Sequence, residues 1–67
     1  MKKFAKRLKK LREERGLSLA TLAGETELNY QAIQHWESER RTPNAEAVII
    51  LARFFGVTTD YLLGETD

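Results

Sequence analysis

The chain contains 67 residues, carries a formal net charge of +1 and has no cysteine. This length supports one small domain, which we expect to span residues 1–67. The lack of cysteine excludes disulfide bonds and thiolate metal sites. The longest apolar run, 47–52, is far shorter than the roughly 20 residues of a transmembrane helix, and the chain start does not resemble a signal peptide. We therefore expect a cytoplasmic protein that does not enter a membrane.

The charged side chains are unevenly distributed along the chain. Residues 1–15 contain eight of the eleven Lys and Arg side chains and two of the ten acidic ones. The remainder has three arginines against eight acids. A phosphate backbone would therefore be met by basic patches and not by the whole surface. The plainer interpretation of the basic start is a solvated face on a core helix. A membrane-surface helix is disfavoured because the apolar stripe is narrow.

Apolar residues recur at helical spacing in five segments, and no segment alternates as a strand does. The first helix is predicted over 3–15, where Phe4, Leu8 and Leu11 form the apolar stripe. Gly16 then suits the left-handed conformation that often follows a helix. The later helices follow residues that commonly cap helix starts, namely Ser18, Asn29, Asn44 and Thr58. Their predicted ranges are 19–25, 29–38, 45–55 and 59–63. The predicted fold class is all-α.

The third predicted helix has two chemically different faces. One face contains Ile33 and is apolar. The opposite face and its flanks hold a phenol, two amides, an imidazole and a hydroxyl: Tyr30, Gln31, Gln34, His35 and Ser38. The major groove of B-DNA admits an α-helix, and there Gln can bond N6 and N7 of adenine while His can donate to guanine or phosphate. Exposed Gln and His are also common as solvated residues, so residue types alone leave both interpretations open.

No catalytic or metal-binding constellation is evident. One His and no Cys exclude a conventional metal site built from these ligands. The sequence contains no nucleophile–base pairing, no glycine-rich phosphate loop and no pair of carboxylates on a common helix face. We expect neither an enzyme nor a requirement for a cofactor.

Two opposite charges lie on inward-facing stripes. Arg12 follows Leu8 by four residues on the first helix, and Glu37 follows Ile33 by four on the third. Each charge is costly on a buried face unless it meets the other. We therefore predict an Arg12–Glu37 ion pair that fixes the angle of the third helix. The alternative is that both side chains reach outward to solvent separately.

The order of these motifs resembles the Cro/repressor-type helix-turn-helix domains, the xenobiotic-response-element class of bacterial and phage regulators. The resemblance covers about residues 4–63 and rests on LKKLREERGLS, LNYQAIQHWE, RRTP and VIILARFFGVTTDYLL. It implies a lambda-repressor-like fold of five helices, in which the second and third form the unit that reads DNA.

The resemblance also implies roles for individual residues. The positions that match base-reading residues of the family are Tyr30, Gln31, Gln34 and His35. Those that match phosphate-contacting or nearby positions are Ser18, Asn29, Ser38, Arg40 and Arg41. Arg12 and Glu37 match an ion pair found in some members. Members usually bind palindromic operators as dimers through their C-terminal helices, and the apolar residues that fit such a contact are Ile49, Ile50, Phe54 and Tyr61.

Three positions depart from the family pattern. Many members have Gln at the start of the second helix, where it contacts phosphate, but this chain has Leu19. Glycine is common in the turn before the third helix and again after that helix, but here Glu27 and Glu39 occupy these places. A left-handed backbone at either glutamate would cost roughly 1 kcal/mol or more, and each carboxylate would approach DNA phosphates.

The resulting hypothesis is a repressor or regulator that binds double-stranded DNA as a homodimer, with helix 29–38 in the major groove. The alternative is an antitoxin-like interaction module, whose main target is a partner protein and whose DNA binding is autoregulatory. Glu27 and Glu39 favour this alternative, because they place negative charge near the expected phosphates.

Overall fold

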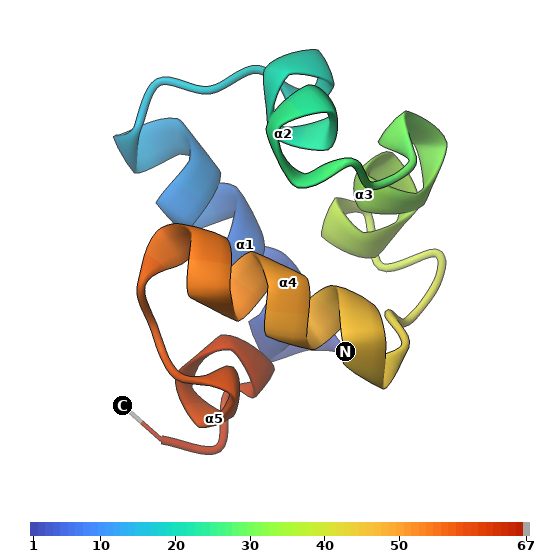
Figure 1. Cartoon of the computed structure of the whole chain (residues 1–67). Helices are drawn as coiled ribbons and strands as arrows, with labels where there is room; N and C mark the ends of the chain where they lie inside the picture. Colours follow the sequence, from blue (N-terminus) through green and yellow to red (C-terminus); the bar gives the residue numbers. More distant parts are fainter. Residues whose placement is uncertain (67) are drawn as a thin grey trace.

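The computed structural model describes residues 1–66, which form five α-helices and contain no strand (Figure 1). The helices are α1 (Lys2–Glu14), α2 (Leu19–Thr26), α3 (Tyr30–Glu37), α4 (Ala45–Phe55) and α5 (Thr59–Leu63). The predicted all-α class is confirmed, and each predicted helix boundary lies within one residue of the observed one. None of the helices in the described stretch combines the length and apolar composition needed to cross a bilayer.

The starts of α2 to α5 are fixed by the capping side chains that the sequence predicted. In each case a side-chain oxygen accepts a hydrogen bond from the backbone N–H three residues later. The capping residues are Ser18, Asn29, Asn44 and Thr58, with donor–acceptor distances between 2.8 and 3.0 Å. These bonds satisfy one of the free backbone donors at each helix start, so the helices begin where short polar residues stand.

All five helices end at a left-handed residue followed by a backbone bond that closes the last turn. Glycine provides this conformation after α1, α4 and α5, whereas glutamate provides it after α2 and α3. Glu27 has a φ of 59° and Glu39 a φ of 65°, and they are the only non-glycine residues with positive φ within residues 1–66. The helix α3 therefore has a strained residue on either side of it.

The core is one cluster of apolar side chains contributed by all five helices. The helix α1 packs against α3 and α5, while α4 packs against α2 and α5 (Figure 1). Phe4 and Leu8 of α1 are fully buried, as is Ile33 of α3. The Phe4 and Trp36 rings meet edge to face with centroids 6.4 Å apart. These contacts hold the apolar face of α3 against α1 and leave its opposite face outside the core.

Candidate nucleic-acid interface

The outward face of α3 carries the four side chains predicted to read bases. Tyr30, Gln31 and Gln34 are exposed, with 44% of the Tyr30 surface accessible, and His35 is half-buried. All four belong to one helix of eight residues, which spans about 12 Å at 1.5 Å per residue. The structure therefore groups amide, phenol and imidazole groups on one short rod, where a duplex can approach them.

The five predicted phosphate contacts surround α3 and are all exposed. Ser18 and Asn29 use their side-chain oxygens as helix caps, and Ser18 Oγ also donates to Thr21 Oγ1. After α3 the chain folds back, because the backbone N–H groups of Arg40 and Arg41 both bond the carbonyl of His35, at 2.9 and 3.4 Å. The two arginines are therefore exposed residues whose backbone lies next to the C-terminal end of α3.

The fifth member of this set, Ser38, caps the end of α3. Its hydroxyl donates to the carbonyl of His35 at 3.3 Å, and its backbone N–H bonds the carbonyl of Gln34 at 3.1 Å. The side chain is thereby held at the point where the helix turns into the arginine-bearing segment.

The guanidinium of Arg12 and the carboxylate of Glu37 form a bidentate ion pair between α1 and α3. Arg12 Nε donates to Glu37 Oε2 at 2.7 Å, and its Nη2 donates to Oε1 at 2.9 Å. The remaining Nη1 donates to the carbonyl of Leu17 at 2.8 Å, just before α2. Only 13% and 8% of the two side chains are accessible to solvent. The pair therefore fixes α3 relative to both α1 and the start of α2.

Electrostatics within this pair favour the charged form of the arginine. The hydrogen bonds that Arg12 donates to the Glu37 carboxylate are the main reason that the pKa of Arg12 is raised, and burial opposes this shift. Arg12 therefore remains positively charged, and its charge is matched inside the protein instead of being displayed to a ligand.

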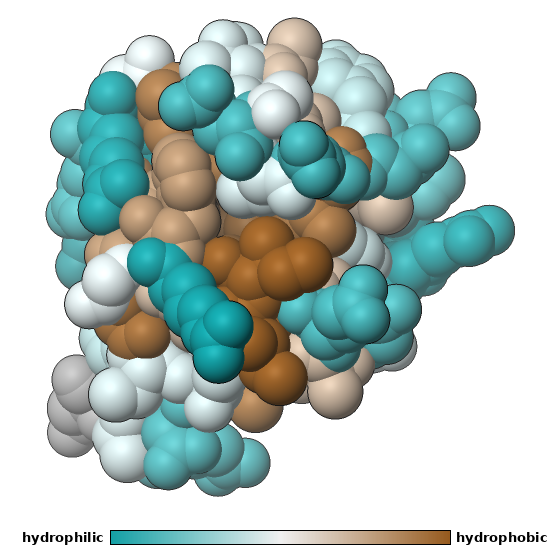
Figure 2. All heavy atoms as spheres, in the orientation of Figure 1, coloured by the Kyte–Doolittle hydropathy of each residue, from teal (hydrophilic) through white to brown (hydrophobic). Residues whose placement is uncertain are grey.

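Three of the four apolar residues predicted to form a dimer contact have different neighbours, and the fourth, Ile50, is half-buried. Ile49 is 42% exposed and lines a groove between α4 and α5 together with Val48 and Leu63. Figure 2 shows hydrophobic surface gathered over α4 in the centre of this face. Phe54 is half-buried beneath Arg15, whose guanidinium carbon lies 5.3 Å from the ring centre.

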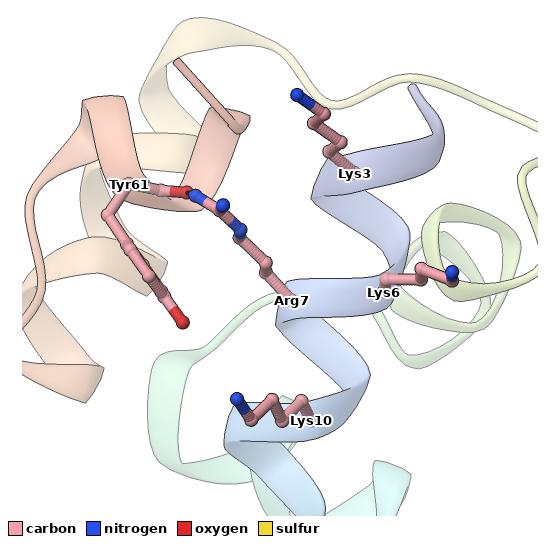
Figure 3. Close-up of a pocket in the computed structure, with 5 residues that line it drawn as sticks. All are labelled: Lys3, Lys6, Arg7, Lys10 and Tyr61. Carbon is pink, nitrogen blue, oxygen red and sulfur yellow. Dashed lines mark hydrogen bonds between the residues drawn. The ribbon is translucent and has the colours of Figure 1, made fainter. Parts of the chain in front are cut away.

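Tyr61 faces α1 and not this groove. Figure 3 shows Arg7 of α1 directed at Tyr61, and the guanidinium carbon lies 4.3 Å from the ring centre. The same guanidinium donates to the backbone carbonyl of Tyr61. Lys3, Lys6 and Lys10 line the depression around this contact. The sequence analysis missed the role of Arg7, although its position three residues after Phe4 places it on the flank of the apolar stripe.

Two short helices joined by a three-residue turn, with the second helix presenting a polar face, define a helix-turn-helix domain. Comparison with known proteins agrees. The chain belongs to the helix-turn-helix domain family, whose model matches residues 5–67, and this family is the Cro-type class of DNA-binding transcriptional regulators predicted above. It is a non-enzymatic family.

Several curated relatives are transcriptional regulators of this class. The uncharacterized regulator YobD of Bacillus subtilis is 33% identical over 64 residues, covering 96% of this chain and 57% of the relative. The transcriptional activator BcrR of Enterococcus faecalis is 37% identical over 60 residues, covering 90% and 29%. The regulator ImmR of B. subtilis is 29% identical over 64 residues, covering 96% and 50%. The chain thus spans about half of most of these relatives, and less of BcrR.

Proposed function

We propose that this chain binds a specific operator sequence by placing α3 in the major groove. The observation that carries the proposal is the row of hydrogen-bonding side chains on the outward face of α3, backed by the partly buried Arg12–Glu37 pair. The amides of Gln31 and Gln34 suit adenine edges, and His35 and Tyr30 suit guanine, thymine methyl or phosphate groups. Residues 1–67 act as one DNA-binding unit. This unit works in the cytoplasm, where it can reach bacterial or phage DNA.

The residues around α3 would fix its register on the duplex. Arg40 and Arg41 are exposed cations, and Ser18, Asn29 and Ser38 are polar groups at helix ends. Such groups suit phosphate oxygens, which position a protein without reading sequence. Base selectivity would then come from α3 alone.

We propose that the regulatory effect is repression by a dimer on a palindromic operator. Two copies of α3 about 34 Å apart would enter successive major grooves and exclude polymerase from the same DNA. One of the relatives is named an activator, so activation is the opposite outcome that a reporter assay of the operator would reveal. No cofactor has a part in this mechanism.

The substitution Gln31→Ala tests the base-reading role. We expect roughly tenfold weaker binding to the cognate duplex, because one bidentate base contact is lost. Binding to random duplex should hardly change, since phosphate contacts remain. The measurement is fluorescence anisotropy on the duplex that wild-type protein enriches from a random pool. An equal loss on cognate and random duplexes would contradict base reading by Gln31.

The substitution Ile49→Glu tests the dimer contact. A charge on this exposed apolar residue should prevent two α4 surfaces from meeting and weaken binding to a full palindrome by about tenfold, or ~1.4 kcal/mol. Binding to a duplex with one half-site should stay at the wild-type level. Unchanged binding to the palindrome would move the dimer contact away from Ile49.

The second candidate function is the antitoxin-like module, which the positions of Glu27 and Glu39 favour. Both carboxylates are exposed at the ends of α3, where they oppose phosphate binding. A protein whose main target is another protein tolerates such charges. Co-expression with a small protein encoded by an adjacent gene, followed by co-purification, distinguishes this candidate, because a stable complex is expected only here.

A further inference from the structure

A second surface depression lies beside the Arg12–Glu37 pair, where α1, α2 and α3 meet. Its lining residues are Lys9, Arg12, Leu19, Gln34, Glu37 and Ser38. Two of them, Gln34 and Glu37, are on the helix proposed to enter the major groove, and Ser38 caps its end. A DNA strand that borders this groove would therefore pass over the depression.

The charge of this depression resides on Lys9. Both carboxylate oxygens of Glu37 are occupied by Arg12, so these two residues compensate each other. Lys9 is exposed and forms no salt bridge with any residue in the range 1–66. The depression thus presents one uncompensated ammonium group at the end of a flexible side chain.

The first residue of α2, Leu19, contributes no side-chain hydrogen-bond donor to this surface. Leu19 is half-buried and packs against the core cluster, so its side chain offers only apolar atoms. The amide of Gln34 can donate hydrogen bonds from the opposite wall, whereas the Ser38 hydroxyl already donates to the carbonyl of His35. An anion seated here would therefore find one neutral donor on α3 and one cation, which comes from α1.

We propose that Lys9 binds a backbone phosphate of the DNA strand that borders the groove occupied by α3, and so supplies from α1 the contact that Leu19 cannot make. This inference rests on the proposed DNA-binding function and adds a residue outside the helix-turn-helix unit. Lysine suits the task because its ammonium acts as a point charge that tolerates a range of phosphate positions.

The neighbouring Lys10 provides a matched control. It has the same charge, belongs to the same helix and is also exposed. It lines the other depression and points toward the α5 side of α1, as Figure 3 shows. General electrostatic attraction would treat Lys9 and Lys10 alike, whereas a specific phosphate contact would depend on Lys9.

The test measures the affinity of the intact chain for its selected duplex and for a random duplex over a range of KCl concentrations. Lys9→Gln removes the charge and keeps a helix-forming side chain. We expect the slope of log K against log salt to fall by about 0.9 for each protomer bound, and affinity at 0.1 M salt to drop roughly eightfold per protomer relative to the change at 1 M. The loss should be the same on both duplexes, because phosphates carry no sequence information.

Lys9→Arg should retain the wild-type slope, and Lys10→Gln should change it by less than half as much as Lys9→Gln. The inference would be overturned if Lys9→Gln and Lys10→Gln reduced the salt slope equally. It would also be overturned if Lys9→Arg reduced the slope as much as Lys9→Gln does. If wild-type protein enriches no duplex from the pool, the proposed function fails and the role of Lys9 fails with it. If wild type binds selectively and Lys9→Gln matches it, only the role of Lys9 is wrong.

Discussion

Replacing Glu37 with alanine is expected to lower the free energy of unfolding by about 3 kcal/mol. The substitution leaves the Arg12 side chain, which is 13% exposed, without its counter-ion and without two of its three hydrogen bonds. Burying an unpaired charge costs more than the intact pair contributes. A domain of this length has a total stability of roughly 3–10 kcal/mol, so the variant should lose about a third of its stability or more. Urea denaturation followed by circular dichroism measures the loss.

Two companion variants separate charge compensation from packing. Glu37→Gln retains an acceptor for Arg12 and should lose less than alanine does. The double variant Arg12→Met/Glu37→Leu removes both charges and leaves the carbonyl of Leu17 without its donor. It should lose only about 1 kcal/mol. If the double variant is as unstable as Glu37→Ala, the instability comes from packing and the ion-pair explanation is wrong.

The double variant also distinguishes stability from DNA recognition. The ion pair joins α1, α3 and the segment before α2 through directional bonds, whereas an apolar pair fixes only distance. We therefore expect the double variant to fold but to discriminate less between cognate and random duplexes. This outcome would identify orientation of α3 as the contribution of Arg12 and Glu37 to function.

Helix boundaries were predictable because local chemistry determines them. Asn44 and Gly56 bracket α4 through a side-chain cap and a left-handed residue, and both act within a few residues of the chain. The Arg12–Glu37 pair is long-range, yet it was also predictable. A charge on each of two apolar stripes leaves few other ways to satisfy both.

Contacts between flanks of different helices were not predictable in the same way. Arg7 over Tyr61 and Arg15 over Phe54 depend on how α1 packs against α5 and on how its end meets α4, and helical periodicity does not specify either. The same limit explains why the predicted dimer residues have different neighbours. The position of Lys9 beside Leu19 and Gln34 likewise follows from three helices meeting, and no single segment encodes it.

The sequence predicted strain at Glu27 and Glu39 only if the backbone there is left-handed. The sequence showed Glu27 and Glu39 at positions where related chains use glycine, but a backbone angle depends on whether the helix really closes there. The structure shows both closures. Leu28 N–H bonds the carbonyl of Ala23 at 3.1 Å, and Arg40 N–H bonds that of His35 at 2.9 Å. The backbone strain at Glu27 and Glu39 therefore comes from the helix ends that close on either side of α3.

The double substitution Glu27→Gly/Glu39→Gly is expected to raise the free energy of unfolding by about 2 kcal/mol, or ~1 kcal/mol at each site. Glycine adopts positive φ without the steric cost that a Cβ imposes, and this gain exceeds its greater loss of backbone entropy. The two effects should add, because the whole length of α3, about 12 Å by helical rise, separates the sites. Thermal and urea denaturation of the single and double variants measure both the size and the additivity.

The variants Glu27→Gln and Glu39→Gln keep the strain and remove the charge. If the carboxylates oppose DNA phosphates, the glutamine variants should bind all duplexes more tightly with unchanged stability, and the glycine variants should gain both affinity and stability. If glutamine and glycine variants bind DNA as weakly as wild type, the two carboxylates do not face phosphates. If glutamine alone raises stability, charge and not backbone strain is the cost at these sites.

A chain selected for DNA affinity has no evident reason to retain two acids that cost both stability and binding. If removing the two carboxylates raises DNA affinity, the natural chain is not optimised for the tightest possible binding to DNA.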